Sequence, residues 1–185
     1  YKVNTNLKLM IIMNKKVLLL ALYIMAAVIP SASAQKSKKN EMVAYLFTYF
    51  NGNNPKQEQI CYALSDDGYN FTPLNSGKPV INSDTIAFTQ CVRDPHILRC
   101  EDGKTFYMVV TDMRSELGWS SNRGIVLLKS TDLINWEHHA INFPTRYTKT
   151  WHNVIRVWAP ETIYDHRVGK YMVFYSLRTS DRDSY

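Results

Sequence analysis

The sequence predicts an all-β fold built from repeated four-stranded antiparallel sheets. Short runs rich in Tyr, Phe, Val and Ile alternate with Asn-Gly, Asp-Gly and Gly-Lys turns, and no convincing helical pattern follows residue 42. Such runs are typical of strands joined by tight turns. Similar segments also recur about every 64 residues. Four antiparallel strands in each repeat is the composition of a propeller blade, so we predict a β-propeller of which about two blades are present.

The repeat is visible in three pairs of segments. The runs "AYLFTYF", "FYMVVTDM" and "KYMVFYS" align on Tyr45, Tyr107 and Tyr171, at offsets of 62 (107 − 45) and 64 (171 − 107). "LSDDGYNF" is echoed by "KSTDLINW", and "DPHIL" by "APETI", with Pro95 and Pro160 separated by 65 residues. A β-sandwich is the competing architecture, but it does not predict strands led by prolines at the spacing of a blade.

One period contains four predicted strands, which span residues 96–99, 105–111, 124–129 and 136–141. Pro95 and Pro160 are expected to open the inner strands of successive blades. Residues 42–185 hold little more than two periods, whereas a propeller needs at least four blades. We therefore expect this region to be the N-terminal part of a larger protein.

The first 34 residues predict an export signal rather than a folded segment. A short basic stretch, residues 13–16, precedes an apolar run at 17–29, then Pro30 and the small-residue site Ala32-Ser33-Ala34. This is the pattern of a secretory signal peptide cleaved before Gln35, with residues 1–12 as upstream read-through and 35–41 as a lead-in. The apolar run is shorter than the ~20 residues of a membrane span. We expect a periplasmic or extracellular protein without a membrane span after cleavage; a retained membrane anchor is the alternative.

Charge and cysteine content restrict the partners. Four of the 22 basic residues precede Gln35 and no acidic residue does, so the remainder carries 18 basic against 16 acidic residues, a net charge of +2. That balance does not favour a nucleic-acid partner. Cys91 and Cys100 would be up to ~30 Å apart across a strand, too far for a disulfide. A bridge from Cys61 to either stays open, and buried free thiols are the expectation. No Cys-x-x-Cys or His-x-x-x-His spacing predicts a metal site, and no cofactor is expected.

The stretch "CVRDPHILRC" places an acid at the start of an apolar strand. Residues entering the inner strand of a blade face the central channel, and Asp94 and Glu161 take similar places in successive repeats, at an offset of 67. Two carboxylates facing one pocket suit glycosidic hydrolysis, where one activates water and the other protonates the leaving oxygen. Alternatively, Asp94 caps a turn and pairs with Arg93 or Arg99.

The motifs "VRDPHIL", "NRGIVLLKSTDLINW" and "VWAPETIYD" together resemble glycoside hydrolase family 43, five-bladed propellers that cleave arabinose- or xylose-type linkages. The resemblance runs from about Tyr45 to the end of the chain. It implies that Asp94 is the general base of an inverting mechanism and that Glu161 lines the substrate site or supports it. The family's pKa-tuning aspartate and general-acid glutamate have no matching motif before Tyr185, so the chain by itself is expected to be inactive.

Other residues near the predicted strand mouths are candidates for substrate contact. Trp158 is expected to stack on a sugar ring or to pack in the core, and Asp112 to face the pocket or to cap a turn. Arg93 and His96 would orient Asp94 or donate to hydroxyls, and a polar rim is expected around Trp119 and Trp151. The predicted substrate-binding residues are Arg93, His96, Asp112, Asn153, Trp158 and Glu161.

The predicted function is therefore glycoside hydrolysis of the α-L-arabinofuranosidase or β-xylosidase type, acting on side chains of plant-type polysaccharides or on oligosaccharides. A non-catalytic carbohydrate-binding propeller is the main alternative, because it would keep an aromatic rim without the acids. A sialidase-type propeller is disfavoured, since "SDDGYNF" and "STDLINW" do not fit the spacing of its repeated turn. A purely structural repeat protein is a further alternative.

Overall fold

The computed structural model describes residues 43–181. The predicted read-through, signal peptide and lead-in lie outside the described residues. Among residues 43–181, no helix reaches the length and apolarity that a bilayer crossing requires.

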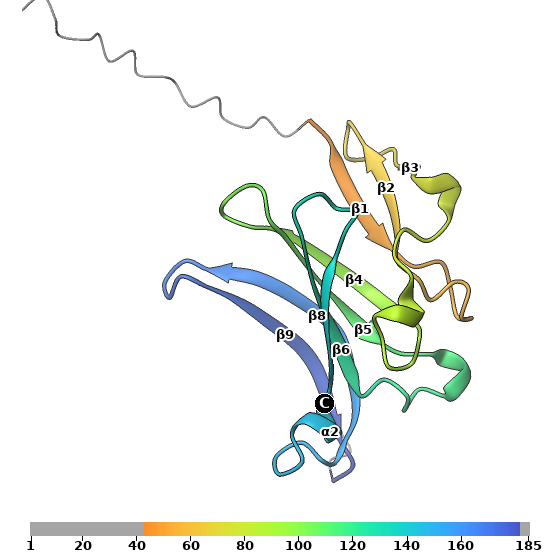
Figure 1. Cartoon of the computed structure of the whole chain (residues 1–185), viewed down its shortest axis with the longest axis vertical. Helices are drawn as coiled ribbons and strands as arrows, with labels where there is room; N and C mark the ends of the chain where they lie inside the picture. Colours follow the sequence, from red (N-terminus) through yellow and green to blue (C-terminus); the bar gives the residue numbers. More distant parts are fainter. Residues whose placement is uncertain (1–42, 182–185) are drawn as a thin grey trace, which may run out of the picture. The chain divides into compact units, whose positions relative to one another are not determined.

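The described residues form three antiparallel sheets in chain order, joined by short helical turns (Figure 1). The first sheet contains β1 (Tyr45–Tyr49), β2 (Cys61–Ser65) and β3 (Thr72–Pro73). The middle sheet contains β4 (Val92–Arg99), β5 (Phe106–Asp112), β6 (Gly124–Ser130) and β7 (Glu137–Asn142). The third sheet contains β8 (Val154–Asp165) and β9 (Lys170–Thr179). The connections carry the short helices η1 (Asn75–Gly77), η2 (Ser83–Thr85), η3 (Ser115–Leu117) and α2 (Phe143–Arg146).

The middle sheet confirms the predicted unit of four sequential antiparallel strands, in the order β4-β5-β6-β7. The position of the prolines differs from expectation. β4 begins at Val92 and β8 at Val154, and Pro95 and Pro160 lie inside these strands where the pairing register shifts. A proline has no N–H to donate to a ladder, so inside a sheet it is tolerated at a bulge.

The repeat is confirmed at atomic detail in the β2–β3 and β6–β7 turns. In each, a serine hydroxyl (Ser65 or Ser130) contacts the aspartate two residues on (Asp67 or Asp132). That aspartate accepts hydrogen bonds from the backbone N–H groups two and three residues further on, and from the side chain of the asparagine three residues on. Because the turns match, β1–β3 correspond to β5–β7. The register shifts at Pro95 and Pro160 show that β8–β9 correspond to β4–β5.

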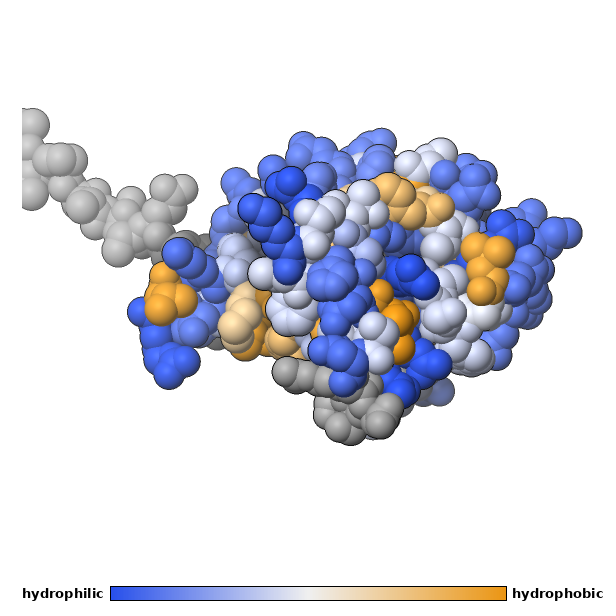
Figure 2. Space-filling view, turned by 90° about the horizontal axis from the view of Figure 1, so that it is seen from below, coloured by the Kyte–Doolittle hydropathy of each residue, from blue (hydrophilic) through white to orange (hydrophobic). Residues whose placement is uncertain are grey.

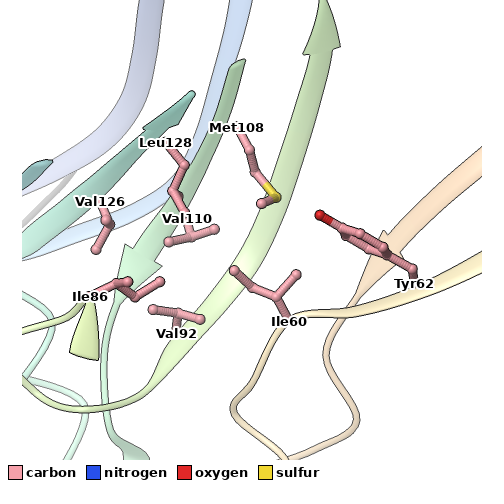
Figure 3. Close-up of a cluster of buried hydrophobic side chains, with 8 residues drawn as sticks. All are labelled: Ile60, Tyr62, Ile86, Val92, Met108, Val110, Val126 and Leu128. Atoms are coloured by element: carbon pink, nitrogen blue, oxygen red, sulfur yellow. The ribbon is translucent and has the colours of Figure 1, made fainter. Parts of the chain in front are cut away.

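The middle sheet has a hydrophobic cluster on each face. Alternate side chains of a strand point to opposite faces; Met108 and Leu128 pack toward the first sheet, where they join Ile60 and Tyr62 (Figure 3). On the other face, a second cluster connects the middle and third sheets through Ile125, Phe143, Val154 and Val157. The three sheets are therefore stacked face to face in chain order.

All three cysteines are buried and unbridged, which confirms the expectation of free thiols. Burial, with a smaller effect of the nearby Glu58 carboxylate, raises the pKa of the Cys91 thiol to about 11.

Large apolar side chains stay exposed on the first and third sheets. Tyr45 and Phe47 of β1 are 58% and 51% exposed, and Met172 and Phe174 of β9 are 45% and 43% exposed. Figure 2 shows separate apolar patches that interrupt a largely hydrophilic surface. In contrast to the middle sheet, the two flanking sheets thus present apolar area to solvent.

Candidate active site

Asp94 sits in a strained bulge of β4. The register pairs Arg93 with Thr111 and His96 with Val109, so Asp94 and Pro95 together lie opposite a single residue, Val110. Asp94 has a φ of 49°, which is unusual for a residue other than glycine and more so before a proline. Such conformations cost ~1–3 kcal/mol and persist where the surroundings hold them, commonly at functional sites.

Hydrogen bonds hold three successive residues of this bulge, each from a different sheet. The Thr111 hydroxyl of β5 donates to Asp94 Oδ2 at 2.8 Å. The Thr48 hydroxyl of β1 donates to the Pro95 carbonyl at 2.9 Å. The Thr162 N–H of β8 donates to His96 Nδ1 at 3.2 Å. All three sheets therefore form hydrogen bonds to the bulge that carries Asp94, and the middle sheet binds its carboxylate through Thr111. His96 connects β4 to β8 and has no hydrogen bond to Asp94 among residues 43–181.

A second bulge of the same kind occurs in β8. Trp158 pairs with Ser176 and Glu161 with Phe174, so Ala159 and Pro160 share one opposing residue, and Ala159 has a φ of 45°. The residue equivalent to Asp94 is therefore Ala159, and the expected equivalence with Glu161 is wrong by two positions. The repeat follows the prolines, 65 residues apart, and not the acids. The Glu161 side chain is exposed.

Arg93 contacts a buried acid and not Asp94. Its Nη1 donates to Glu58 Oε1 at 2.9 Å and to Asn53 Oδ1 at 2.8 Å. The guanidinium also lies over two rings, 4.5 Å from the centre of Phe50 and 5.5 Å from that of Trp119. The expected roles of Arg93 and Arg99 as partners of Asp94 are therefore not found, since Arg99 donates instead to the backbone.

Glu58 is the charged residue that sequence reasoning missed. Its side chain is fully buried, and it also accepts from the Ser115 N–H at 3.0 and 3.1 Å. Glu58 thus connects Arg93 to the loop that carries Trp119. The available signal was weak: "QEQI" shows an acid directly before a buried strand and contains no motif.

Two tryptophans form an aromatic wall beside the bulges. Trp119 and Trp158 meet edge to face with ring centres 6.2 Å apart, and Trp119 is 52% exposed. Arg156 lies over Trp158 at 5.1 Å, as Arg93 does over Trp119. Indole faces bind apolar surfaces such as the C–H face of a sugar, and flanking guanidinium groups supply hydrogen-bond donors.

Two other predicted substrate residues have structural partners. Asp112 is buried, and its carboxylate accepts from the Phe88 and Thr89 N–H groups and from the Thr89 hydroxyl. Of the two roles expected for Asp112, facing the pocket or capping a turn, these hydrogen bonds correspond to the capping role. Asn153 donates to Asp181 Oδ1 at 2.7 Å, which ties the start of β8 to the end of β9.

Asn122, three residues after Trp119, is also buried. It exchanges hydrogen bonds with the backbone of Val157 and so joins the middle and third sheets. In the part of the chain that the structure describes, no group of three or more His, Cys, Asp or Glu side chains is arranged to hold a metal ion.

Two comparisons with known proteins bear on this arrangement. Residues 40–185 match the model of a glycosyl hydrolase family 43-related group, described as "Probable glycosyl hydrolase domain". Over 138 residues the chain is also 30% identical to a protein named alpha-L-arabinofuranosidase from Bifidobacterium longum subsp. longum. That match covers 71% of this chain and 13% of the relative, so the chain spans a small part of the relative's length.

Proposed function

The chain belongs to the glycosyl hydrolase family 43-related domains, and on that premise we propose that it supplies the general base of a glycoside hydrolase. The proposal is carried by Asp94. One carboxylate oxygen, Oδ2, accepts from Thr111, while Oδ1 has no hydrogen-bond partner among residues 43–181. A carboxylate fixed through one oxygen, with the other available, is suited to accept a proton from water.

The proposed reaction is an inverting hydrolysis. Asp94 takes a proton from a water molecule as that water attacks the anomeric carbon, and a carboxylic acid on the opposite side protonates the leaving oxygen. The two carboxyl groups must stand ~6.5–9.5 Å apart to admit the water. No residue of the described site takes the place of this acid, so we propose that it comes from another part of the full-length protein and that residues 40–185 are inactive by themselves.

We further propose that the three sheets are successive blades of a propeller. The matching turns imply that the first sheet holds the three outer strands of its blade. The matching bulges of β4 and β8 imply that the third sheet holds the two inner strands of its own blade. The exposed apolar faces of β1 and β9 support this proposal, because in a ring each blade packs its faces on its neighbours.

The substrate is proposed to be a carbohydrate with arabinofuranosidic or related xylosidic linkages. The support is the name of the similar B. longum protein and the wall formed by Trp119 and Trp158. Such polymers are met outside the cell, and we propose that the protein is exported through its N-terminal signal. N-terminal sequencing of the exported protein should give Gln35 as its first residue.

A non-catalytic carbohydrate-binding role is the second candidate, favoured by the tryptophan wall, because Trp119 and Trp158 meet without any contribution from a catalytic acid. The two roles are separated by Asp94→Asn in the full-length protein. Asparagine keeps the shape and tolerates a positive φ, but it accepts no proton. If Asp94 is the base, kcat on an aryl arabinofuranoside or xyloside should fall by ~10²–10⁴-fold, with sugar binding retained.

The matched control is Asp66→Asn, because Asp66 is exposed and distant in sequence from the bulge; its kcat should stay at the wild-type value. Proton NMR of the first product should show the inverted anomer. Normal kcat in a well-folded Asp94→Asn variant would exclude the proposed base. Oligosaccharide binding without any hydrolysis by the wild-type protein would establish the binding role instead.

A further inference from the structure

Thr111 lies where the two strained bulges meet. Its side chain is fully buried on the face of β5 that points toward the third sheet. Its hydroxyl donates to Asp94 Oδ2 at 2.8 Å and accepts from the Ala159 N–H at 3.1 Å. Asp94 and Ala159 are the equivalent positions of β4 and β8, and each has a positive φ. One hydroxyl therefore joins the two inner strands at their most constrained residues.

The direction of these bonds is fixed by chemistry. A backbone N–H donates and never accepts, so the Thr111 oxygen must be the acceptor for Ala159. A hydroxyl carries one proton, which is then committed to the Asp94 carboxylate. Hydrogen bonds in such a chain polarise one another, so the Ala159 N–H makes the hydroxyl a better donor. Thr111 thus has no freedom to rotate without losing one bond.

The neighbouring sequence shows that a hydroxyl here is not needed for packing. Thr111 follows Val109 and Val110 in a strand that is buried from Met108 to Asp112. Valine has nearly the same shape, and burying a hydroxyl without a partner costs free energy. The hydroxyl is thus explained by its two hydrogen bonds.

We propose that Thr111 is a positioning residue that fixes the Asp94 carboxylate and makes its orientation depend on the docking of the third sheet. This rests on the proposed function of Asp94 as the general base. With the third sheet docked through Ala159, the hydroxyl can satisfy Ala159 and Asp94 only in one rotamer. Oδ2 is then occupied and Oδ1 is left to face the attacking water.

The test compares Thr111→Val, Thr111→Ser and Asp94→Asn in the full-length protein on one aryl glycoside. Thr111→Val removes the donor with little change of shape, and a misplaced catalytic group commonly costs up to ~10²-fold in rate. We expect kcat to fall about 10–100-fold in Thr111→Val, with KM within about twofold of wild type. Thr111→Ser keeps the hydroxyl and should restore kcat. Ser130→Ala is the control, a buried hydroxyl lost from a remote turn, and should lower the melting temperature with normal kcat.

The results test the positioning role of Thr111 separately from the proposed role of Asp94 as the general base. If Asp94→Asn is inactive while Thr111→Val has normal kcat, the positioning role is overturned and the base stands. If Thr111→Ser is as slow as Thr111→Val, the hydroxyl is not the cause and the positioning role is again overturned. If the wild type is inactive, or Asp94→Asn is fully active, both proposals fall. Should Thr111→Val not fold, Thr111→Ala removes the same donor and makes the same test.

Discussion

Removing the Glu58 carboxylate should lower the free energy of unfolding more than removing any exposed charged group of the described residues. Glu58 is fully buried, and its Oε1 lies 2.9 Å from Arg93 Nη1. Glu58→Ala would leave a guanidinium whose side chain is 11% exposed without its counter-charge, and a Ser115 N–H without its acceptor. Breaking a buried ion pair from one side typically costs 3–5 kcal/mol. Asn53 and two aromatic rings still contact Arg93, so we expect about 3 kcal/mol, the lower end of that range.

Urea denaturation of the full-length protein measures this loss as a lower midpoint at unchanged slope. Glu58→Gln keeps an acceptor for Ser115 and should lose less than Glu58→Ala. The double variant with Arg93→Met should lose less than the sum of the single changes, because the pair is then absent from both sides. The exposed pair Lys129–Glu137, 3.8 Å apart, gives a control, and Glu137→Ala should have no measurable effect. A Glu58→Ala variant as stable as Glu137→Ala would refute the role of the buried pair.

Two further predictions concern the repeated turns and acid stability. Leu133 has a φ of 64° at the turn position where the matching residue, Gly68, has 77°. In urea denaturation, Leu133→Gly should therefore raise the free energy of unfolding by up to about 1 kcal/mol, and Gly68→Ala should lower it. A less stable Leu133→Gly variant would contradict the prediction that the left-handed backbone strains Leu133. The Thr105 hydroxyl and N–H, with the Lys104 N–H, lower the pKa of Asp102 from 3.8 to about 2. Its stabilising effect is present above the unfolded pKa and is lost as the pH falls from 3.8 toward 2, so the melting temperature should drop less over that range in Asp102→Asn than in wild type, and parallel curves would contradict the assignment.

The sequence by itself determined the local structure. Strand pattern, turn chemistry and the repeat follow from residues close together in the chain, as the matching Ser-Asp-Asn turns show. It also indicated the family, since the Asp-Pro and Trp-Ala-Pro-acid segments occur in one stretch of chain, and it singled out Asp94. These features could be predicted because the pleat of a strand and the geometry of a turn depend on neighbouring residues.

Only the tertiary structure decided how the candidate residues are partnered. Arg93 was expected beside Asp94, yet it binds Glu58, 35 residues earlier in the chain. Thr111 meets Ala159 across 48 residues, and nothing in either segment indicates that contact. The bulges also change which side chains face the site. In a bulge, two residues lie opposite one residue of the neighbouring strand, so the register shifts and alternate positions no longer point to the same face. Which buried acid meets which donor depends on how the sheets stack, and that is set by packing between distant segments.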